Sequence, residues 1–152
     1  MTFDTQSFLS SATSAANDTK IIPCPVGDYQ ALIDKISARQ WQSKDGSQTG
    51  VALDVFWTIE DQGVKDALNR TVVSVKQGIM LDTKVDASGK VVLDDTKGKN
   101  IGLGRLREAV GKNREGETFS FEMLPGLMAR VSVTHRIAGE DTYAEVSKVG
   151  RL

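Results

Sequence analysis

The stretch "IGLGRLREAVG", residues 101–111, is the clearest helical segment in a chain whose other segments favour strands. Leu103, Leu106 and Val110 recur at helical spacing and form one narrow apolar stripe. Asn100 stands at the N-cap position, which asparagine favours. The presence of one short helix inside a mostly β chain needs an explanation, and its position between strands supplies one.

Three glycines indicate where this helix ends and what stabilises it. Gly111 follows it at the position where glycine commonly ends a helix. Gly102 and Gly104 lie within it, and each weakens a helix by about 1 kcal/mol relative to alanine. Packing must therefore stabilise the helix, and we expect it to lie against a sheet edge or the mouth of a barrel.

Alternating patterns on both sides of the helix predict five strands, three before it and two after it. They cover residues 29–37, 51–60, 70–80, 128–137 and 142–152. A polar, glycine-rich stretch joins the first two, a polar linker joins the second and third, and a glycine-acidic turn joins the last two.

Segment 51–60 alternates most clearly. One of its faces is entirely apolar and is the predicted core: Val51, Leu53, Val55, Trp57 and Ile59. Segment 29–37 has apolar groups on both faces, so the pattern leaves its buried face open. Between the third strand and the helix, residues 83–95 predict an extra hairpin that turns at Ser88–Gly89.

Five strands with one helix between the third and fourth is the element order of the OB-fold, in which that helix closes one end of the barrel. The sequence therefore predicts a mainly β, OB-fold-like, five-stranded Greek-key barrel with one short helix between strands three and four and an extra hairpin. The alternative is a β-sandwich with an incidental helix. We predict a flexible N-terminal arm over residues 1–20 and a single OB-fold-like domain over residues 21–152.

The net charge and the numbers of Cys and His residues limit the classes of function that the chain can have. The chain has 152 residues, and Lys+Arg 19 against Asp+Glu 20 gives a net charge of -1. No general attraction to nucleic acid or anionic lipid follows, so a polyanion would have to meet a local patch. Cys24 and His135 are the only residues of their types, too few for a disulfide or a structural zinc site. We expect no metal and no cofactor.

The first twenty residues lack a basic segment followed by an apolar run, so we expect no secretory signal. No apolar run elsewhere approaches the roughly 20 residues that a membrane-spanning helix needs. We therefore expect a cytoplasmic protein that does not associate with membranes.

Cations and aromatic side chains gather along the first strands. Sequence-independent binding of single strands needs cations for the phosphates and aromatic faces for base stacking, which contributes about 1–3 kcal/mol per base. In OB-folds the loop after the first strand and the faces of strands two and three line the groove. We predict these nucleic-acid-binding residues: Lys35, Arg39, Trp41, Lys44, Phe56, Arg70, Lys76, Arg130 and Arg136.

Simpler roles compete with this prediction. Trp41 could cover the edge of the barrel, with the charges as a solvated rim. Further cations stand on the helix and its approach, where simple solvation is the favoured interpretation: Lys97, Lys99, Arg105 and Arg107. Trp57 belongs to the predicted core, so its replacement should affect folding rather than binding.

Signatures of catalysis are scarce, and we predict that the chain is not an enzyme. There is no phosphate-binding loop motif. The tripeptide Asp-Thr-Lys begins at Asp18, Asp82 and Asp95, but no Pro-Asp partner precedes it, which favours turns. His135 has no Ser or Cys motif nearby, and Cys24 has no activating base, so both favour structural roles.

Several segments together resemble a family of small phage-encoded single-stranded-DNA-binding proteins. They are "PCPVGDYQALI", "LDVFWTI", "NIGLGRLREAVG", "LPGLMARVSVTHR" and "DTYAEVSKV", spread over about residues 20–150. The resemblance implies an OB-type protein that coats single-stranded DNA during phage replication or recombination, in the host cytoplasm. It also implies self-association and contacts with replication or recombination enzymes. Such proteins often end in an acidic tail tipped by an aromatic residue, whereas this chain ends in "SKVGRL".

The rival hypothesis is a structural or assembly protein of a phage particle, in which exposed apolar residues such as Phe56, Phe119 and Phe121 serve protein contacts. A small enzyme with an unfamiliar site is a third. Binding predicts that one open face collects the side chains of Arg39, Trp41, Phe56 and Lys76. Assembly predicts an apolar open face paired with another subunit.

Overall fold

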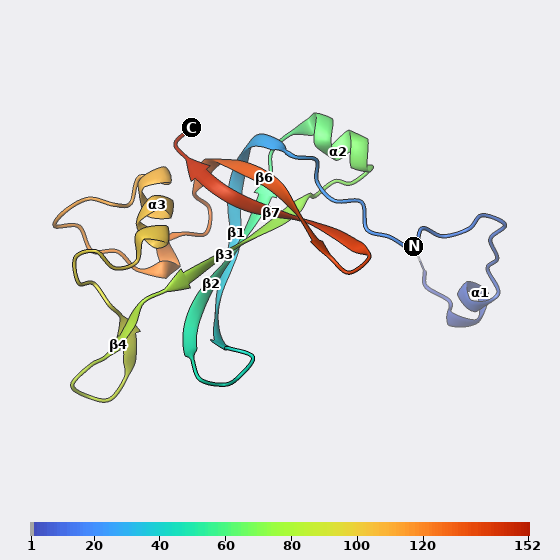
Figure 1. Cartoon of the computed structure of the whole chain (residues 1–152). Coiled ribbons are helices and arrows are strands. Elements are labelled where there is room, and N and C mark those ends of the chain that lie inside the picture. Colours follow the sequence, from blue (N-terminus) through green and yellow to red (C-terminus); the bar gives the residue numbers. More distant parts are fainter. Residues whose placement is uncertain (1) are drawn as a thin grey trace.

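The computed structural model describes residues 2–152 and contains a closed barrel with the strand order β1-β2-β3-β7-β6 (Figure 1). The barrel strands are β1 (Gly27–Gln42), β2 (Thr49–Ile59), β3 (Ser74–Leu81), β6 (Met128–Ala138) and β7 (Asp141–Gly150). Neighbouring strands are antiparallel except β3 and β7, which are parallel. The predicted mainly β, OB-fold-like barrel is therefore confirmed.

Helix α3 (Ile101–Ala109) lies between β3 and β6 in the chain, as predicted. Its side chains Leu103 and Leu106 are buried in the barrel core. A Cβ atom on Gly102 would lie 3.3 Å from Cγ2 of Ile79, so glycine allows α3 to approach β3 closely. Gly111 has a φ of +76° and ends the helix, as expected.

The predicted extra hairpin is also present. Strands β4 (Thr83–Val85) and β5 (Val91–Leu93) form a separate two-stranded sheet beside α3 (Figure 1). The Asp86 carboxylate accepts hydrogen bonds from the amides of Ser88 and Lys90 and closes the turn.

The polar linker between the second and third predicted strands is in fact a helix, α2 (Gln62–Leu68). Asp61 caps it by accepting a 2.9 Å hydrogen bond from the Val64 amide. Because the Arg70 amide still bonds to the Lys65 carbonyl at the end of α2, β3 begins at Ser74 and not at residue 70 as predicted. Helix α3 is therefore not the only helix. Two short ones are α1 (Thr5–Leu9) and the 3-10 turn η1 (Phe121–Met123).

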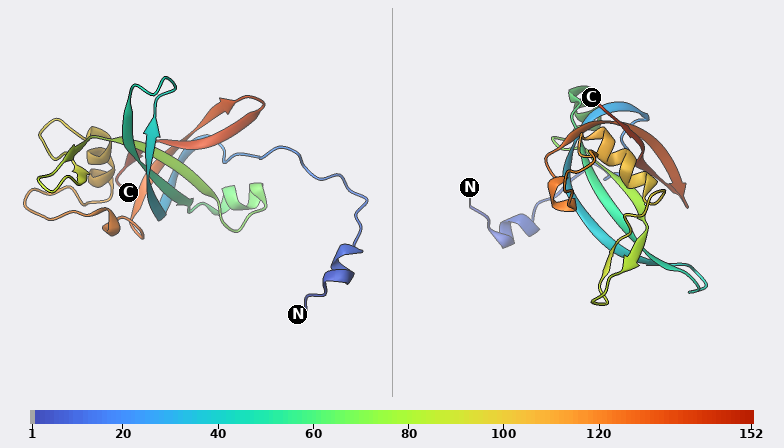
Figure 2. Two further views of the ribbon diagram at one scale, coloured as in Figure 1. Left: turned by 90° about the horizontal axis from the view of Figure 1, so that it is seen from below. Right: turned by 90° about the vertical axis from the view of Figure 1, so that its left-hand side faces the viewer.

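The N-terminal segment lies apart from the barrel. Helix α1 and the extended chain that follows it project away from the strands (Figure 2). Phe3 and Phe8 contact each other with ring centroids 5.6 Å apart, and both are exposed.

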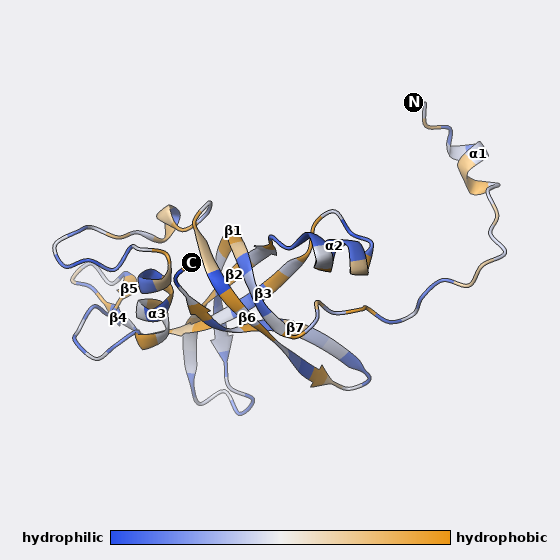
Figure 3. Cartoon of the chain, turned by 90° about the horizontal axis from the view of Figure 1, so that it is seen from above, coloured by the Kyte–Doolittle hydropathy of each residue, from blue (hydrophilic) through white to orange (hydrophobic). Residues whose placement is uncertain are grey.

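The barrel interior contains four of the five core residues predicted on β2, whereas the fifth, Val51, is only half-buried. Leu53, Val55, Trp57 and Ile59 on β2 are all buried. The Trp57 Nε1 donates a 2.9 Å hydrogen bond to Oε1 of Gln77, which satisfies both polar groups inside the barrel. Figure 3 shows the apolar colour gathered on the barrel strands and polar loops at the ends.

Candidate nucleic-acid interface

One row of side chains crosses four strands on the outer face of the barrel. Lys35 on β1 pairs with Phe56 on β2, and Phe56 pairs with Lys76 on β3. Lys76 in turn pairs with Glu145 on β7. Directly opposed residues of neighbouring strands project from the same face, so these four side chains are neighbours. The Lys35 Nζ lies 5.1 Å from the Phe56 ring centroid, a cation–π distance.

A β-bulge on β1 explains why these residues face outward. The register with β2 shifts between Ile33 and Lys35, so one extra residue, Asp34, is inserted. Before the bulge, alternate residues such as Ala31 and Ile33 point into the core and are buried. After the bulge, the same alternation places these residues on the outer face: Lys35, Ser37, Arg39 and Trp41. The bulge also explains why both faces of this segment contain apolar residues.

Asp54 sits at the centre of the outer face and binds two cations. Its side chain is 7% exposed. The Arg39 Nε lies 3.0 Å from Oδ2, and the Lys76 Nζ lies 3.7 Å from Oδ1. A buried carboxylate needs such partners. Asp54 therefore holds one cation from β1 and one from β3 over the middle strand.

Trp41 lies flat on the backbone of the neighbouring strand. It pairs with Gly50, where a Cβ atom would come within 2.6 Å of the indole ring. Only glycine leaves room for the ring, which is half-buried. Within residues 2–152, two side-chain polar atoms are buried without a hydrogen-bond partner, Trp41 Nε1 and Asp54 Oδ1, and both belong to this face. The ion pair with Lys76 accounts for Asp54 Oδ1, so Trp41 Nε1 is the buried donor on this face that has no partner in this part of the chain.

The face continues from β7 onto β6. The Arg136 Nε lies 3.4 Å from Oε2 of Glu145, and the Arg136 guanidinium lies 5.4 Å from the ring centroid of Tyr143. We call this surface the cationic face. It consists of Lys35, Arg39, Trp41, Asp54, Phe56, Lys76, Arg136, Tyr143 and Glu145. Four cations and two carboxylates give these residues a net charge of +2.

Six of the nine predicted residues therefore share this face, and three do not. Lys44 lies in the exposed turn between β1 and β2. Arg70 lies before β3, and its Nη2 donates to the Ile22 carbonyl, so its predicted place on a third strand is wrong. Arg130 projects from β6 between Gln30 of β1 and Gly150 of β7, away from β2 and β3.

Three residues of the cationic face were missed by the sequence prediction: Asp54, Tyr143 and Glu145. Asp54 did give a signal, because an acid in the middle of an apolar strand needs a partner. Glu145 gave none, since the parallel pairing of β3 with β7 that places it opposite Lys76 is a long-range feature. Tyr143 lies opposite Arg136 across the β6–β7 hairpin and was also not singled out.

The turn after β1 is built around one carboxylate. Hydrogen bonds from the Ser43 hydroxyl and from the amide and hydroxyl of Ser47 lower the pKa of Asp45 to about 2. Asp45 therefore stays ionised at neutral pH and orders the turn that contains Lys44.

The side chains of His135 and Cys24 lie in surroundings that favour a structural role. The His135 Nε2 lies 2.7 Å from the Cys24 carbonyl oxygen and donates to it. The Cys24 thiol is buried, and burial, with the Asp61 charge, raises its pKa.

Across residues 2–152, no group of three or more His, Cys, Asp or Glu side chains is placed to hold a metal ion. In the same part of the chain, no helix has the length and apolar character needed to cross a bilayer.

Comparison with known proteins assigns this chain to no family. Neither the family models nor the curated proteins include a match to this chain. The fold and the cationic face define the protein only as a small OB-type barrel with a cationic and aromatic outer surface.

Proposed function

We propose that this protein binds single-stranded DNA with little sequence preference through the cationic face. The observation that supports this most directly is the row Lys35–Phe56–Lys76, in which an aromatic ring lies between two cations on adjacent strands. Cations attract phosphates, and an aromatic ring offers a surface on which a base stacks.

The position of the face supports the same function. Its centre lies on β2 and β3, the strands that OB-folds use to bind oligonucleotides. Trp41 adds a second aromatic ring beside the β1–β2 turn. Stacking on Phe56 and Trp41 accepts any base, because every base has a π-face. Little sequence preference is therefore expected.

The charge distribution favours single strands over general adhesion to polyanions. The whole chain has a net charge of -1, whereas the cationic face has a net charge of +2. The positive charge of this face is thus a local feature and not a property of the whole chain.

The resemblance to phage proteins suggests the biological setting. In this proposal the protein coats single strands during phage DNA replication or recombination and acts without catalysis. Its partners are other copies of itself and replication or recombination enzymes in the host cytoplasm.

Fluorescence-anisotropy titration of labelled oligo-dT at several salt concentrations tests the proposal. We expect binding that weakens steeply with salt, is much poorer for duplex DNA of matched length, and drops for Trp41→Ala and Phe56→Ala. Each lost stacking contact should weaken binding by about 1–3 kcal/mol. Phe8→Ala removes an exposed ring away from the barrel and should bind like the wild type.

Absence of oligo-dT binding at low salt would overturn the proposal and favour the assembly hypothesis. That hypothesis needs an apolar open face, and two of its suggested contact residues are not available. Phe119 and Phe121 pack against the core, and the Arg107 guanidinium covers the Phe119 ring at 4.3 Å. Exposed apolar side chains do occur on the N-terminal segment, at Phe3 and Phe8.

A further inference from the structure

The barrel wall is closed by few strand contacts beside the cationic face. Strands β3 and β7 pair only at Lys76 and Glu145, and α3 contacts both strands beyond that point. A groove of about 490 Å³ lies there. Its lining includes Gly78 and Met80 from β3, Lys148 from β7 and Arg105 from α3.

A second, larger cavity adjoins this groove along α3. Its volume is about 860 Å³, and it is lined by the loop before α3, by α3 itself and by the end of β7. Arg105 and Val149 line both spaces, so the two are adjacent. We call the combined space the α3 groove.

The α3 groove is lined by cations that have no partner. Four of them form neither an ion pair nor a side-chain hydrogen bond with any residue in the range 2–152: Lys97, Lys99, Arg105 and Lys148. Two carboxylates of the lining are already neutralised. Asp95 lies 2.9 Å from Lys84 Nζ, and Glu108 lies 2.8 Å from Arg151 Nη2. The third carboxylate of the lining, Asp94, forms no ion pair with any described residue, and the nearby charge of Lys99 helps to lower its pKa. Four cations against this one carboxylate leave the groove with a net positive charge.

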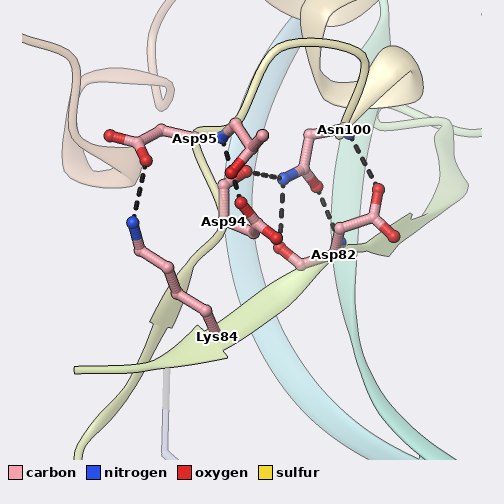
Figure 4. A network of polar contacts seen from close by, with 6 residues as sticks. Asp82, Lys84, Asp94, Asp95 and Asn100 are labelled. Atoms are coloured by element: carbon pink, nitrogen blue, oxygen red, sulfur yellow. Dashed lines mark hydrogen bonds and ion pairs between the residues drawn. The ribbon is translucent and has the colours of Figure 1, made fainter.

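The loop that contains two of these cations is held in place. Asn100 accepts a hydrogen bond from the Asp82 amide and donates to the carbonyls of Asp82 and Asp94 (Figure 4). Figure 4 also shows Asp95 turned toward Lys84. These bonds fix the backbone on either side of Lys97 and Lys99, so less ordering entropy is lost when a ligand binds them.

We propose that the α3 groove continues the path of single-stranded DNA beyond the cationic face. This inference rests on the proposed function. Strand β3 joins the two surfaces, because Lys76 belongs to the face while Gly78 and Met80 line the groove. From Lys76 to Met80 the strand advances about 13 Å. That reach suits an OB-fold, for which binding sites span about 4–16 nucleotides.

A length-dependent binding experiment tests this inference. Oligo-dT of about 5 and about 15 nucleotides, near the two ends of the range for one OB-fold, are titrated with the wild type and with Lys99→Gln/Arg105→Gln. Affinity of the variant for the short oligonucleotide should stay within about twofold, whereas affinity for the long one should fall about tenfold. Its salt-dependence slope for the long oligonucleotide should fall by about 0.7 per lost phosphate contact.

Lys90→Gln/Arg114→Gln is the matched control, since it removes two positive charges outside the groove lining. It should change neither affinity by more than about twofold. Equal losses for the control and the groove variant would overturn the inference, as would a groove variant that binds both lengths like the wild type. If the wild type binds neither oligonucleotide, the proposed function itself fails.

Discussion

Arg39 and Asp54 face each other from neighbouring strands, and the Arg39 Nε donates a 3.0 Å hydrogen bond to Oδ2 of the buried Asp54 carboxylate. The pair holds a guanidinium on the outer surface of the barrel but leaves a negative charge beneath it. Asp54 therefore both orders the cations of the cationic face and opposes the attraction of phosphates.

Asp54→Asn separates these two effects. A unit charge about 4 Å away in water contributes about 1 kcal/mol, so removing the carboxylate charge should tighten oligo-dT binding about fivefold at low salt. Anisotropy titration measures this. Asp66→Asn, which changes an exposed carboxylate of α2, is the control and should have little effect. Weaker binding by Asp54→Asn would show instead that the ordering of Arg39 and Lys76 dominates.

The sequence was informative where the pattern is local. Alternation alone identified the inward residues of β2, and the glycine at the end of α3 located that helix end. The β1 bulge was not predictable, because an inserted residue such as Asp34 has no composition signal and reverses every later side chain. Helix α2 was missed since its seven residues are too few to show a clear periodicity, although its cap Asp61 was a usable signal.

In the candidate site, too, residues on local patterns were predicted and long-range contacts were not. Phe56 and Lys76 were predicted because OB-folds use strands two and three, and Lys35 because it lies toward the end of the first strand, before the loop that lines the groove. The link from Lys76 through Glu145 to Arg136 depends on the pairing of strands that lie far apart in the sequence. Such long-range pairing is determined by barrel closure, and no local pattern encodes it.

Trp57 and Gln77 form a buried polar pair that should matter for stability and not for binding. Trp57→Phe leaves the Gln77 side chain without its partner, which costs about 1–3 kcal/mol. Trp57→Phe/Gln77→Leu removes both polar groups, so we expect the double variant to unfold at a higher urea concentration than Trp57→Phe. If the two unfold at the same concentration, the unpaired Gln77 amide carries no measurable penalty. Oligo-dT affinity of either variant should match the wild type at temperatures where it is folded.

Cys24 should be unreactive in the native protein. Burial raises the pKa of its thiol, and both burial and protonation slow reaction with a thiol reagent. At pH 8 we expect modification on the order of a hundredfold slower than in urea, if reaction needs a local opening of about 3 kcal/mol. Ser88→Cys, in the exposed β4–β5 turn, is the control for free reaction. Rapid native modification of Cys24 would contradict its burial.

The same thiol predicts a pH dependence of stability. Because burial and the Asp61 charge raise the pKa of Cys24, the folded thiol ionises at a higher pH than the unfolded thiol, whose pKa is about 8.5. Unfolding then releases a proton, so the free energy of unfolding should decline as pH rises above about 8.5. Cys24→Ser, compared with the wild type by urea denaturation at pH 7 and pH 9.5, should lose less stability on this change. An identical loss in both proteins would exclude the contribution of the thiol.

Asp45 should titrate far below an ordinary aspartate. Three hydrogen bonds from Ser43 and Ser47 lower its pKa to about 2. A lowered folded-state pKa contributes stability above the unfolded value of about 3.9, and this contribution is lost as pH falls through about 2. Carboxyl-carbon NMR titration measures the midpoint directly. Ser43→Ala removes the strongest donor and should raise the midpoint, and an unchanged midpoint would rule out that cause.

Asn100 should be essential to the order of the α3 groove. It has a φ of +55°, and three hydrogen bonds join its side chain to Asp82 and Asp94. Asn100→Ala loses these bonds and retains a left-handed backbone, so it should destabilise the fold by about 2–4 kcal/mol in urea unfolding. Asn100→Gly also loses the bonds but adopts this φ freely, and should be destabilised by about 1 kcal/mol less. Equal destabilisation by Ala and Gly would mean that the side-chain bonds alone matter. If neither variant is destabilised, the loop before α3 does not depend on Asn100, and Lys97 and Lys99 are not held in place for binding.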